Sequence, residues 1–164
     1  LFTSETFGLA KAAVLTKDRT ISGFLHYFES IGSGDAFRRM CILDALILNT
    51  DRHSGNFGVL YQNDTMEVQK MAPVFDNNRS LLFDLDDDQL KNAEWCIRHC
   101  SPRLGVDFVA TARGLMTTAI HSDLENLRDF HFEQHPNIPA PQERLDCLTE
   151  IVQRQLGEIL IQTL

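Results

Sequence analysis

The sequence predicts an α+β fold that is mostly helical and carries one small β hairpin. Three observations support this prediction. Apolar residues recur at helical spacing between Ile21 and Leu48, two short strand-like segments flank a turn at residues 62–64, and the chain has a helical pattern from residue 84 to its end. A chain of 164 residues can bury a substantial core, so we expect one domain or a large piece of one.

Two helices are predicted on either side of a glycine-rich break, Gly32-Ser33-Gly34. The first is indicated by apolar residues at helical spacing, namely Ile21, Phe24, Leu25, Phe28 and Ile31. Asp35 is expected to cap the second, which covers Ala36–Leu48. Because this second helix is apolar nearly all round, we expect it at the centre of the core.

After the second helix the pattern changes to two polar loops that flank a hairpin. The first loop, residues 49–56, precedes a strand predicted over Phe57–Tyr61, and Met66–Lys70 is predicted to return beside it. A short apolar run then leads to Asp76 and to a second polar loop at residues 77–80. Loops held in place by regular elements often carry chemistry, so these two loops are the first place to search for a site.

The C-terminal half is predicted to be helical. Helices are expected over residues 84–100, Val106–Ile120, Asp123–Phe132 and Pro141–Leu164. The first of them starts with four carboxylates, at Asp84, Asp86, Asp87 and Asp88. Such a cluster can hold a metal, but a solvated helix N-terminus is favoured because the helix dipole stabilises negative charge there.

Composition and charge exclude several classes of function. The net charge is −8 and no basic stripe occurs, so direct nucleic-acid binding is not expected. No run approaches the ~18 consecutive apolar residues of a membrane span, so no membrane association is expected. The four cysteines lack the paired spacing of a zinc site and are expected to be reduced thiols of a cytoplasmic protein.

One set of polar residues suggests a reaction. Asp51 and Asn56 are separated by four residues, and Asp76 follows Asn56 by 20 residues at the end of the apolar run. Phosphoryl transfer needs a carboxylate to accept the proton of the attacking hydroxyl, and hard oxygen ligands to hold Mg²⁺ against the nucleotide phosphates. The spacing is consistent with Asp51 as the base and with Asn56 and Asp76 as metal ligands. Asp and Asn are also favoured in turns, which leaves a purely structural loop open.

Two segments carry a more specific resemblance, LNTDRHSGNF at Leu48–Phe57 and APVFD at Ala72–Asp76. They resemble the catalytic and metal-binding loops of HipA-like kinases, whose pattern is Asn-x-Asp-x-His-x-x-Asn-Phe followed by an apolar-Pro-x-aromatic-Asp strand end. The resemblance implies that residues 1–164 form a protein-kinase-like C-terminal lobe with the hairpin between these two loops. It also implies transfer of a phosphoryl group from ATP, with Mg²⁺, to a Ser or Thr hydroxyl of a protein substrate.

The resemblance implies a role for each matching residue. Asp51 would be the catalytic base, and Asn56 and Asp76 would bind Mg²⁺. His53 belongs to the same catalytic set, where we expect it to brace the loop rather than to transfer protons. Arg52 is expected either to ease charge near a phosphate or to lie in solvent. Two residues just past the metal-binding Asp would face the bound nucleotide, Asn78 and Arg79.

The match departs from a complete kinase in one respect. A kinase needs a glycine-rich lid over the phosphates and a strand lysine that pairs with them. Neither occurs here, since Gly32-Ser33-Gly34 lies between two predicted helices. We therefore expect an N-terminal lobe upstream of Leu1, and we expect this chain alone to bind nucleotide weakly and to be inactive or nearly so.

Two other functions remain open from the sequence. The missing lid and the acidic exterior also fit a catalytically inactive kinase-like module that acts as an interaction or regulatory partner of a DNA-binding antitoxin. A metal-dependent phosphohydrolase could use His53 with Asp51 and Asp76, but these loops offer fewer His and Asp ligands than such a site requires.

Overall fold

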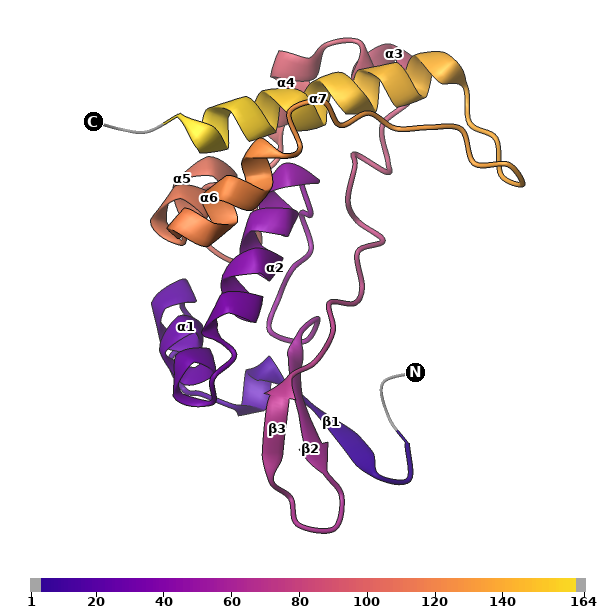
Figure 1. Cartoon of the computed structure of the whole chain (residues 1–164). Helices are drawn as coiled ribbons and strands as arrows, with labels where there is room; N and C mark the ends of the chain where they lie inside the picture. Colours follow the sequence, from indigo (N-terminus) through magenta and orange to yellow (C-terminus); the bar gives the residue numbers. More distant parts are fainter. Residues whose placement is uncertain (1–3, 162–164) are drawn as a thin grey trace.

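The structure, a computed structural model, describes residues 4–161. The strands are β1 (Phe7–Lys11), β2 (Gly58–Gln62) and β3 (Val68–Met71). The helices are the 3₁₀ turn η1 (Ala12–Val14), α1 (Ile21–Ser30), α2 (Gly34–Leu46), α3 (Asp87–Leu90), α4 (Ala93–His99), α5 (Phe108–Gly114), α6 (Thr118–Glu125) and α7 (Gln142–Leu160). The sheet lies at one end of the molecule, α3, α4 and α7 lie at the other, and α2 runs between them (Figure 1). This confirms an α+β fold that is mostly helical.

The sheet has three strands rather than the two of the predicted hairpin. β2 lies in the middle, with β1 antiparallel on one side and β3 antiparallel on the other. Gly58 makes the β1 pairing possible, because a Cβ atom there would lie 2.0 Å from the carbonyl oxygen of Ala10. β1 was missed because its sequence, FGLAK, is short and has no β-branched residue. β3 starts at Val68 rather than Met66, since Met66 adopts a left-handed turn conformation.

The predicted central position of α2 is confirmed. Most of its apolar side chains are buried, and α1 and α5 both pack against it. The predicted cap is wrong: α2 begins at Gly34, and Asp35 lies in its first turn, where it pairs with Arg39 at 2.7 Å. Ser33 occupies the cap position, and its hydroxyl oxygen accepts the backbone N–H of Met71 at 3.0 Å. This bond links the end of β3 to the start of α2.

A cluster of four buried phenylalanines joins the first two helices to the sheet. Its members are Phe24, Phe28, Phe37 and Phe57. Phe57 meets Phe24 edge to face with ring centroids 5.0 Å apart, and Phe28 stacks on Phe37 at 5.2 Å. Phe57 directly follows Asn56, so the cluster anchors the end of the first polar loop in the core.

The helices predicted between residues 84 and 132 are shorter in the structure because side chains end them by capping new ones. By contrast, α7 covers most of the predicted helix Pro141–Leu164, whose last three residues lie outside the described residues. Asn92 accepts the backbone N–H of Trp95 and splits the predicted helix 84–100 into α3 and α4. Thr117 does the same for α6, so the predicted helices Val106–Ile120 and Asp123–Phe132 are replaced by α5 and α6. A cap side chain that bonds the backbone competes with helix continuation. None of the helices between residues 4 and 161 combines the length and the apolar composition of a membrane span.

The acidic cluster at residues 84–88 lies at the N-terminus of α3, which is the interpretation that the sequence favours over a metal site. Asp86 and Gln89 form a reciprocal capping box at the start of α3. Asp87 pairs with Arg144 at 2.8 Å. Within residues 4–161 there is no group of three or more His, Cys, Asp or Glu side chains that could hold a metal ion, so the ligand set required by a phosphohydrolase is not found there.

Candidate active site

The first polar loop begins at a sharp turn at the C-terminal end of α2. The backbone N–H of Asn49 donates to the carbonyl oxygen of Asp44 at 2.9 Å, while Leu48 adopts a left-handed conformation with φ of 50°. This is the Schellman arrangement, in which glycine usually occupies the left-handed position. A leucine there costs about 1–2 kcal/mol of backbone strain. The buried Leu48 side chain offsets this strain through packing.

Arg52 lies at the centre of the loop and is buried, with 2% of its surface exposed. Its Nε and one Nη donate to both carboxylate oxygens of Asp44, at 2.8 and 2.9 Å. Its other Nη donates to the carbonyl oxygens of Asn56, at 2.7 Å, and Phe75, at 2.6 Å. A fifth hydrogen bond reaches the side-chain oxygen of Asn77. All five N–H donors are thus used inside the protein, and both expectations for Arg52, a phosphate-facing or a solvent-exposed side chain, are wrong.

The buried guanidinium joins the two polar loops. Because one nitrogen atom binds the carbonyl oxygens of both Asn56 and Phe75, these two oxygens lie close together. Asp76 directly follows Phe75, so the backbone next to each predicted metal ligand is fixed at the same point. A further link runs from the backbone N–H of Thr50 to the carbonyl oxygen of Arg79, at 3.2 Å. The loops before β2 and after β3 therefore form one unit.

Asp44 balances the charge of this buried guanidinium. Burial raises the pKa of the Asp44 carboxyl, and its hydrogen bonds with Arg52 and Asn49 oppose that rise. The Asn49 side-chain amide donates to the carboxylate at 2.9 Å. A fully hydrogen-bonded buried pair of this kind fixes a loop in a single arrangement.

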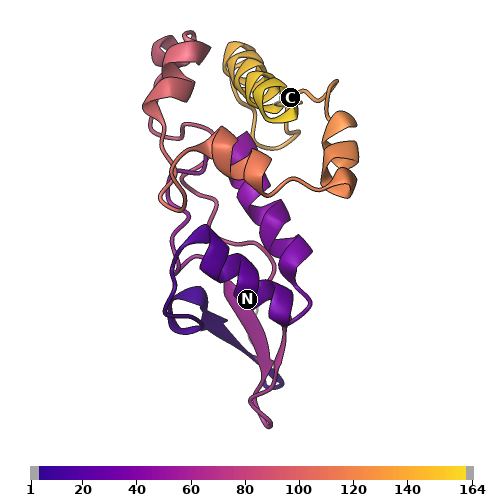
Figure 2. The same cartoon turned by 90° about the vertical axis from the view of Figure 1, so that its left-hand side faces the viewer.

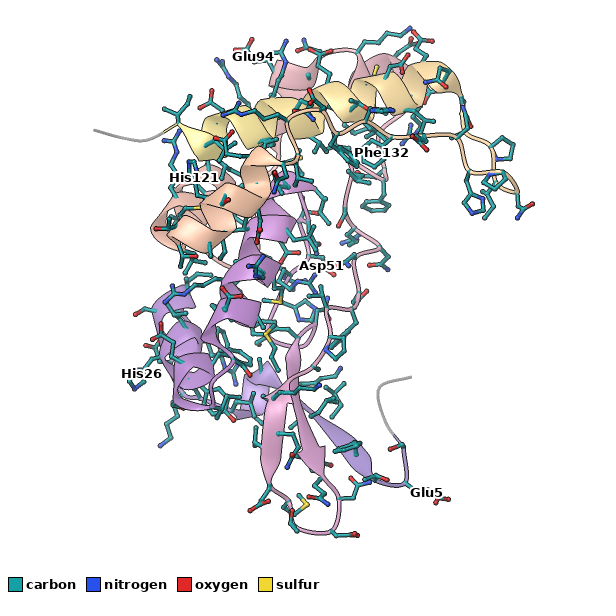
Figure 3. The ribbon with its side chains drawn as sticks, in the orientation of Figure 1. Glu5, His26, Asp51, Glu94, His121 and Phe132 are labelled. Carbon is teal, nitrogen blue, oxygen red and sulfur yellow. The ribbon has the colours of Figure 1, made fainter. Side chains whose placement is uncertain are left out.

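Asp51 lies between α2 and the irregular segment that leads away from the sheet (Figure 3). Its side chain is 19% exposed, and one carboxylate oxygen accepts an N–H of Arg103 at 2.5 Å. This bond holds the pKa of Asp51 below its ordinary value. The backbone of Asp51 is fixed on both sides, because its N–H donates to the Asn49 side chain and its carbonyl oxygen accepts the Asn56 amide, each at 3.1 Å.

Asn56 and Asp76 keep ligand atoms available. The amide nitrogen of Asn56 is used by the Asp51 carbonyl, but its side-chain oxygen accepts no hydrogen bond from residues 4–161. Asp76 is exposed, and its carboxylate has no hydrogen bond or ion pair in the described part of the chain. Asp76 also has a left-handed backbone with φ of 59°, a conformation that Asp tolerates better than most residues. Such outliers often occur at functional sites.

His53 makes a contact within its own loop. Its Nδ1 accepts the backbone N–H of Gly55 at 3.0 Å. The ring lies so close to Gly55 that a Cβ atom there would come within 2.7 Å of it. This arrangement agrees with a bracing role, and a part for His53 in catalysis stays a prediction.

Asn78 and Arg79 are both exposed just past Asp76. The guanidinium of Arg79 lies over the ring of Phe83, 5.3 Å from its centre, and contributes to the positive surroundings of Asp51. Asn78 makes no side-chain hydrogen bond with the residues described. Their contact with a nucleotide stays a prediction.

Three residues of the site have no role in the sequence analysis, namely Asp44, Asn77 and Arg103, and a fourth, Arg52, was given the wrong role. A signal existed for Asp44, since a carboxylate in a helix that is apolar nearly all round must be buried and needs a cationic partner. No local signal pointed to Arg103, which lies 52 residues from Asp51 in the sequence.

Comparison with known proteins supports the fold. No protein-family model and no curated protein matches this chain. Its structure is similar to the crystal structure of CtkA, a proinflammatory kinase of Helicobacter pylori, with a TM-score of 0.60 and 16% sequence identity. The similarity covers 97% of this chain and 70% of the other. The chain therefore has a kinase-like fold.

Proposed function

We propose that this chain is the C-terminal catalytic lobe of a HipA-like kinase, which transfers a phosphoryl group from ATP to a Ser or Thr hydroxyl of a protein substrate. The observation that carries the proposal is the hydrogen bonding of Arg52. Its guanidinium joins the backbone beside Asn56 to the backbone beside Asp76, while the side-chain oxygens of both residues remain available. These two oxygens are therefore hard donors that a cation between the loops could use.

The chemistry proposed for each residue follows from its surroundings. Asp51 is ionised at neutral pH and accepts the proton of the attacking hydroxyl. The amide oxygen of Asn56 and the carboxylate of Asp76 are hard oxygen donors, which suit Mg²⁺. When bound, Mg²⁺ neutralises charge on the nucleotide phosphates. His53 braces the loop through its bond to the Gly55 amide.

The nucleotide needs further contacts that we assign by position. Asn78 and Arg79 follow the metal-binding Asp and are exposed, and we assign them to the phosphates of ATP. The glycine-rich lid and the strand lysine of a complete kinase are proposed to belong to an N-terminal lobe. The same proposal places the kinase in the cytoplasm and makes another protein its substrate.

The test uses the protein expressed in full from its natural gene. Asp51→Asn and Asp76→Asn are each expected to abolish autophosphorylation with labelled ATP and Mg²⁺. The matched control is Asp64→Asn, an exposed aspartate in the turn between β2 and β3, which should keep the activity. Undiminished phosphate transfer in either of the first two variants contradicts the proposal.

A second candidate is an inactive kinase-like module that partners a DNA-binding antitoxin. It is favoured by the Arg103 side chain, which occupies the Asp51 carboxylate. Co-purification with such a partner, together with no phosphate transfer by the complete protein, would support this candidate over the first.

A further inference from the structure

An open groove of about 700 Å³ lies between the start of α1 and the segment that leads into α5. α1 and α5 lie one above the other beside α2 in both views of the molecule (Figures 1 and 2). Much of the groove lining is apolar, with contributions from Ile21, Leu25, Leu104, Val106 and Leu115. Val106 is 91% exposed, so its side chain is accessible to a segment lying in the groove.

The groove meets the candidate active site at one side chain. Arg103 lines the groove and donates to the carboxylate of Asp51 at 2.5 Å. Its side chain is 60% exposed, so its bond to Asp51 contributes little to stability and breaks easily. A chain segment lying in the groove would therefore reach the proposed catalytic base.

The charged groups of the groove have one sign. Arg19 lines it as well, donates to the carbonyl oxygen of Ala13 and makes no ion pair within residues 4–161. No carboxylate lines the groove, although the whole chain carries a net charge of −8. Three aspartates lie beside the groove, and each has a local partner: Asp18 accepts hydrogen bonds from Thr20, Asp51 pairs with Arg103, and Asp107 caps α5.

An extended peptide fits these features better than the other classes of ligand. Two isolated arginines are too few for nucleic acid, whose affinity rests on many phosphate contacts. The groove is open to solvent, which suits a chain segment rather than an enclosed small molecule. Apolar side chains would cover the lining, and a carboxylate would complement the arginines.

We infer, resting on the proposed kinase activity, that this groove seats the protein substrate and selects a segment that carries apolar side chains and an acidic residue near the accepting hydroxyl. Arg103 then has two alternative partners. Without substrate it binds Asp51, and with substrate it binds the acidic side chain and leaves the Asp51 carboxylate free for the hydroxyl proton. Substrate binding and release of the base are thereby coupled.

The experiment compares two fluorescein-labelled peptides on the complete protein. Both contain a central Ser and flanking Leu residues, and they differ only in carrying Glu or Lys beside the Ser. Affinity is measured by fluorescence anisotropy for the wild type, Arg19→Ala, Arg103→Ala and the double variant. Arg154→Ala is the matched control, because Arg154 is an exposed arginine on α7 that pairs with Glu150 within its own helix.

The wild type and the control are expected to prefer the Glu peptide, and each groove variant is expected to lose about two- to fivefold of that preference, the range typical of exposed ion pairs. Equal affinity of the wild type for the two peptides, or an unchanged preference in the double variant, overturns the inference. Phosphate transfer is measured on the same samples. A binding preference without transfer supports the groove and contradicts the proposed kinase activity, whereas transfer without a preference contradicts the groove alone.

Discussion

Arg52 and Asp44 form a buried ion pair with two hydrogen bonds, at 2.8 and 2.9 Å, beneath the candidate active site. The same guanidinium binds backbone of both polar loops. The pair therefore has two roles. It holds the first polar loop against the end of α2, and it sets the distance between the two segments that carry the proposed metal ligands.

Asp44→Ala is expected to lower the free energy of unfolding by about 3–5 kcal/mol, because it leaves a buried guanidinium without its counter-charge. Arg52→Lys should also destabilise, since an ammonium group has three donors for five acceptors. Urea denaturation measures both. The control is Asp123→Ala, whose exposed bond with Arg39 is expected to contribute less than about 1 kcal/mol. Equal stability of Asp44→Ala and the control would contradict this role of the pair.

Phe57→Ala is expected to lower the free energy of unfolding by about 3–5 kcal/mol, because it empties the centre of the phenylalanine cluster. Phosphate transfer should fall as well, since Asn56 directly precedes Phe57. Phe83→Ala removes a side chain that is about half exposed, and it should cost much less stability. Thermal or urea unfolding compares the two, and a similar loss in both would contradict the anchoring role of Phe57.

Adding a methyl group at two glycines should have opposite consequences, harmful at Gly55 and stabilising at Gly157. A methyl group at Gly55 would collide with the ring of His53, so Gly55→Ala is expected to displace the loop and reduce phosphate transfer. Gly157 lies inside α7, and a methyl group there meets nothing within 4 Å. Gly157→Ala should therefore raise the free energy of unfolding by about 0.5–1 kcal/mol without changing activity. Full activity of Gly55→Ala would show that the close approach of the His53 ring is dispensable.

The carboxyl group of Asp51 should titrate at higher pH when Arg103 is replaced. The Arg103 hydrogen bond stabilises the ionised form, which lowers the pKa of Asp51. Arg103→Ala should raise that pKa toward the ordinary value of about 3.9 for Asp. Asp51 protonation then begins at a higher pH in the variant as the solution is acidified. Carbon-13 NMR titration of the carboxyl measures the shift, and an unchanged or lower pKa would mean that the ion pair does not form in solution.

The candidate site residues that the sequence predicts are those marked by local spacing and by the motif resemblance. Asp51, Asn56 and Asp76 were selected from their intervals and from the apolar run before Asp76. The helical periodicity also placed α2 in the core. These features depend on residues close together in the chain, so a local pattern can indicate them, although the spacing by itself also fits a structural loop.

The parts that were missed depend on distant contacts or on side chains that compete with the backbone. The pairing of β1 with β2 joins residues far apart in sequence, and the ion pair of Arg103 with Asp51 does the same. The helix breaks at Asn92 and Thr117 arise from capping bonds that an apolar pattern does not register. Arg52 is buried because it pairs with the buried Asp44. Its burial could have been predicted only by considering the two residues together.

The central claim is that Asn56 and Asp76 hold one divalent cation together with ATP. Electron paramagnetic resonance of Mn²⁺, a spectroscopic substitute for Mg²⁺, measures its binding to the complete protein in the presence of ATP. We predict that Asp76→Asn and Asn56→Ala each weaken Mn²⁺ affinity at least about tenfold, since even changes outside the ligand shell often cost that much. Asp64→Asn should bind as the wild type does. Unchanged Mn²⁺ affinity in both site variants would contradict the account.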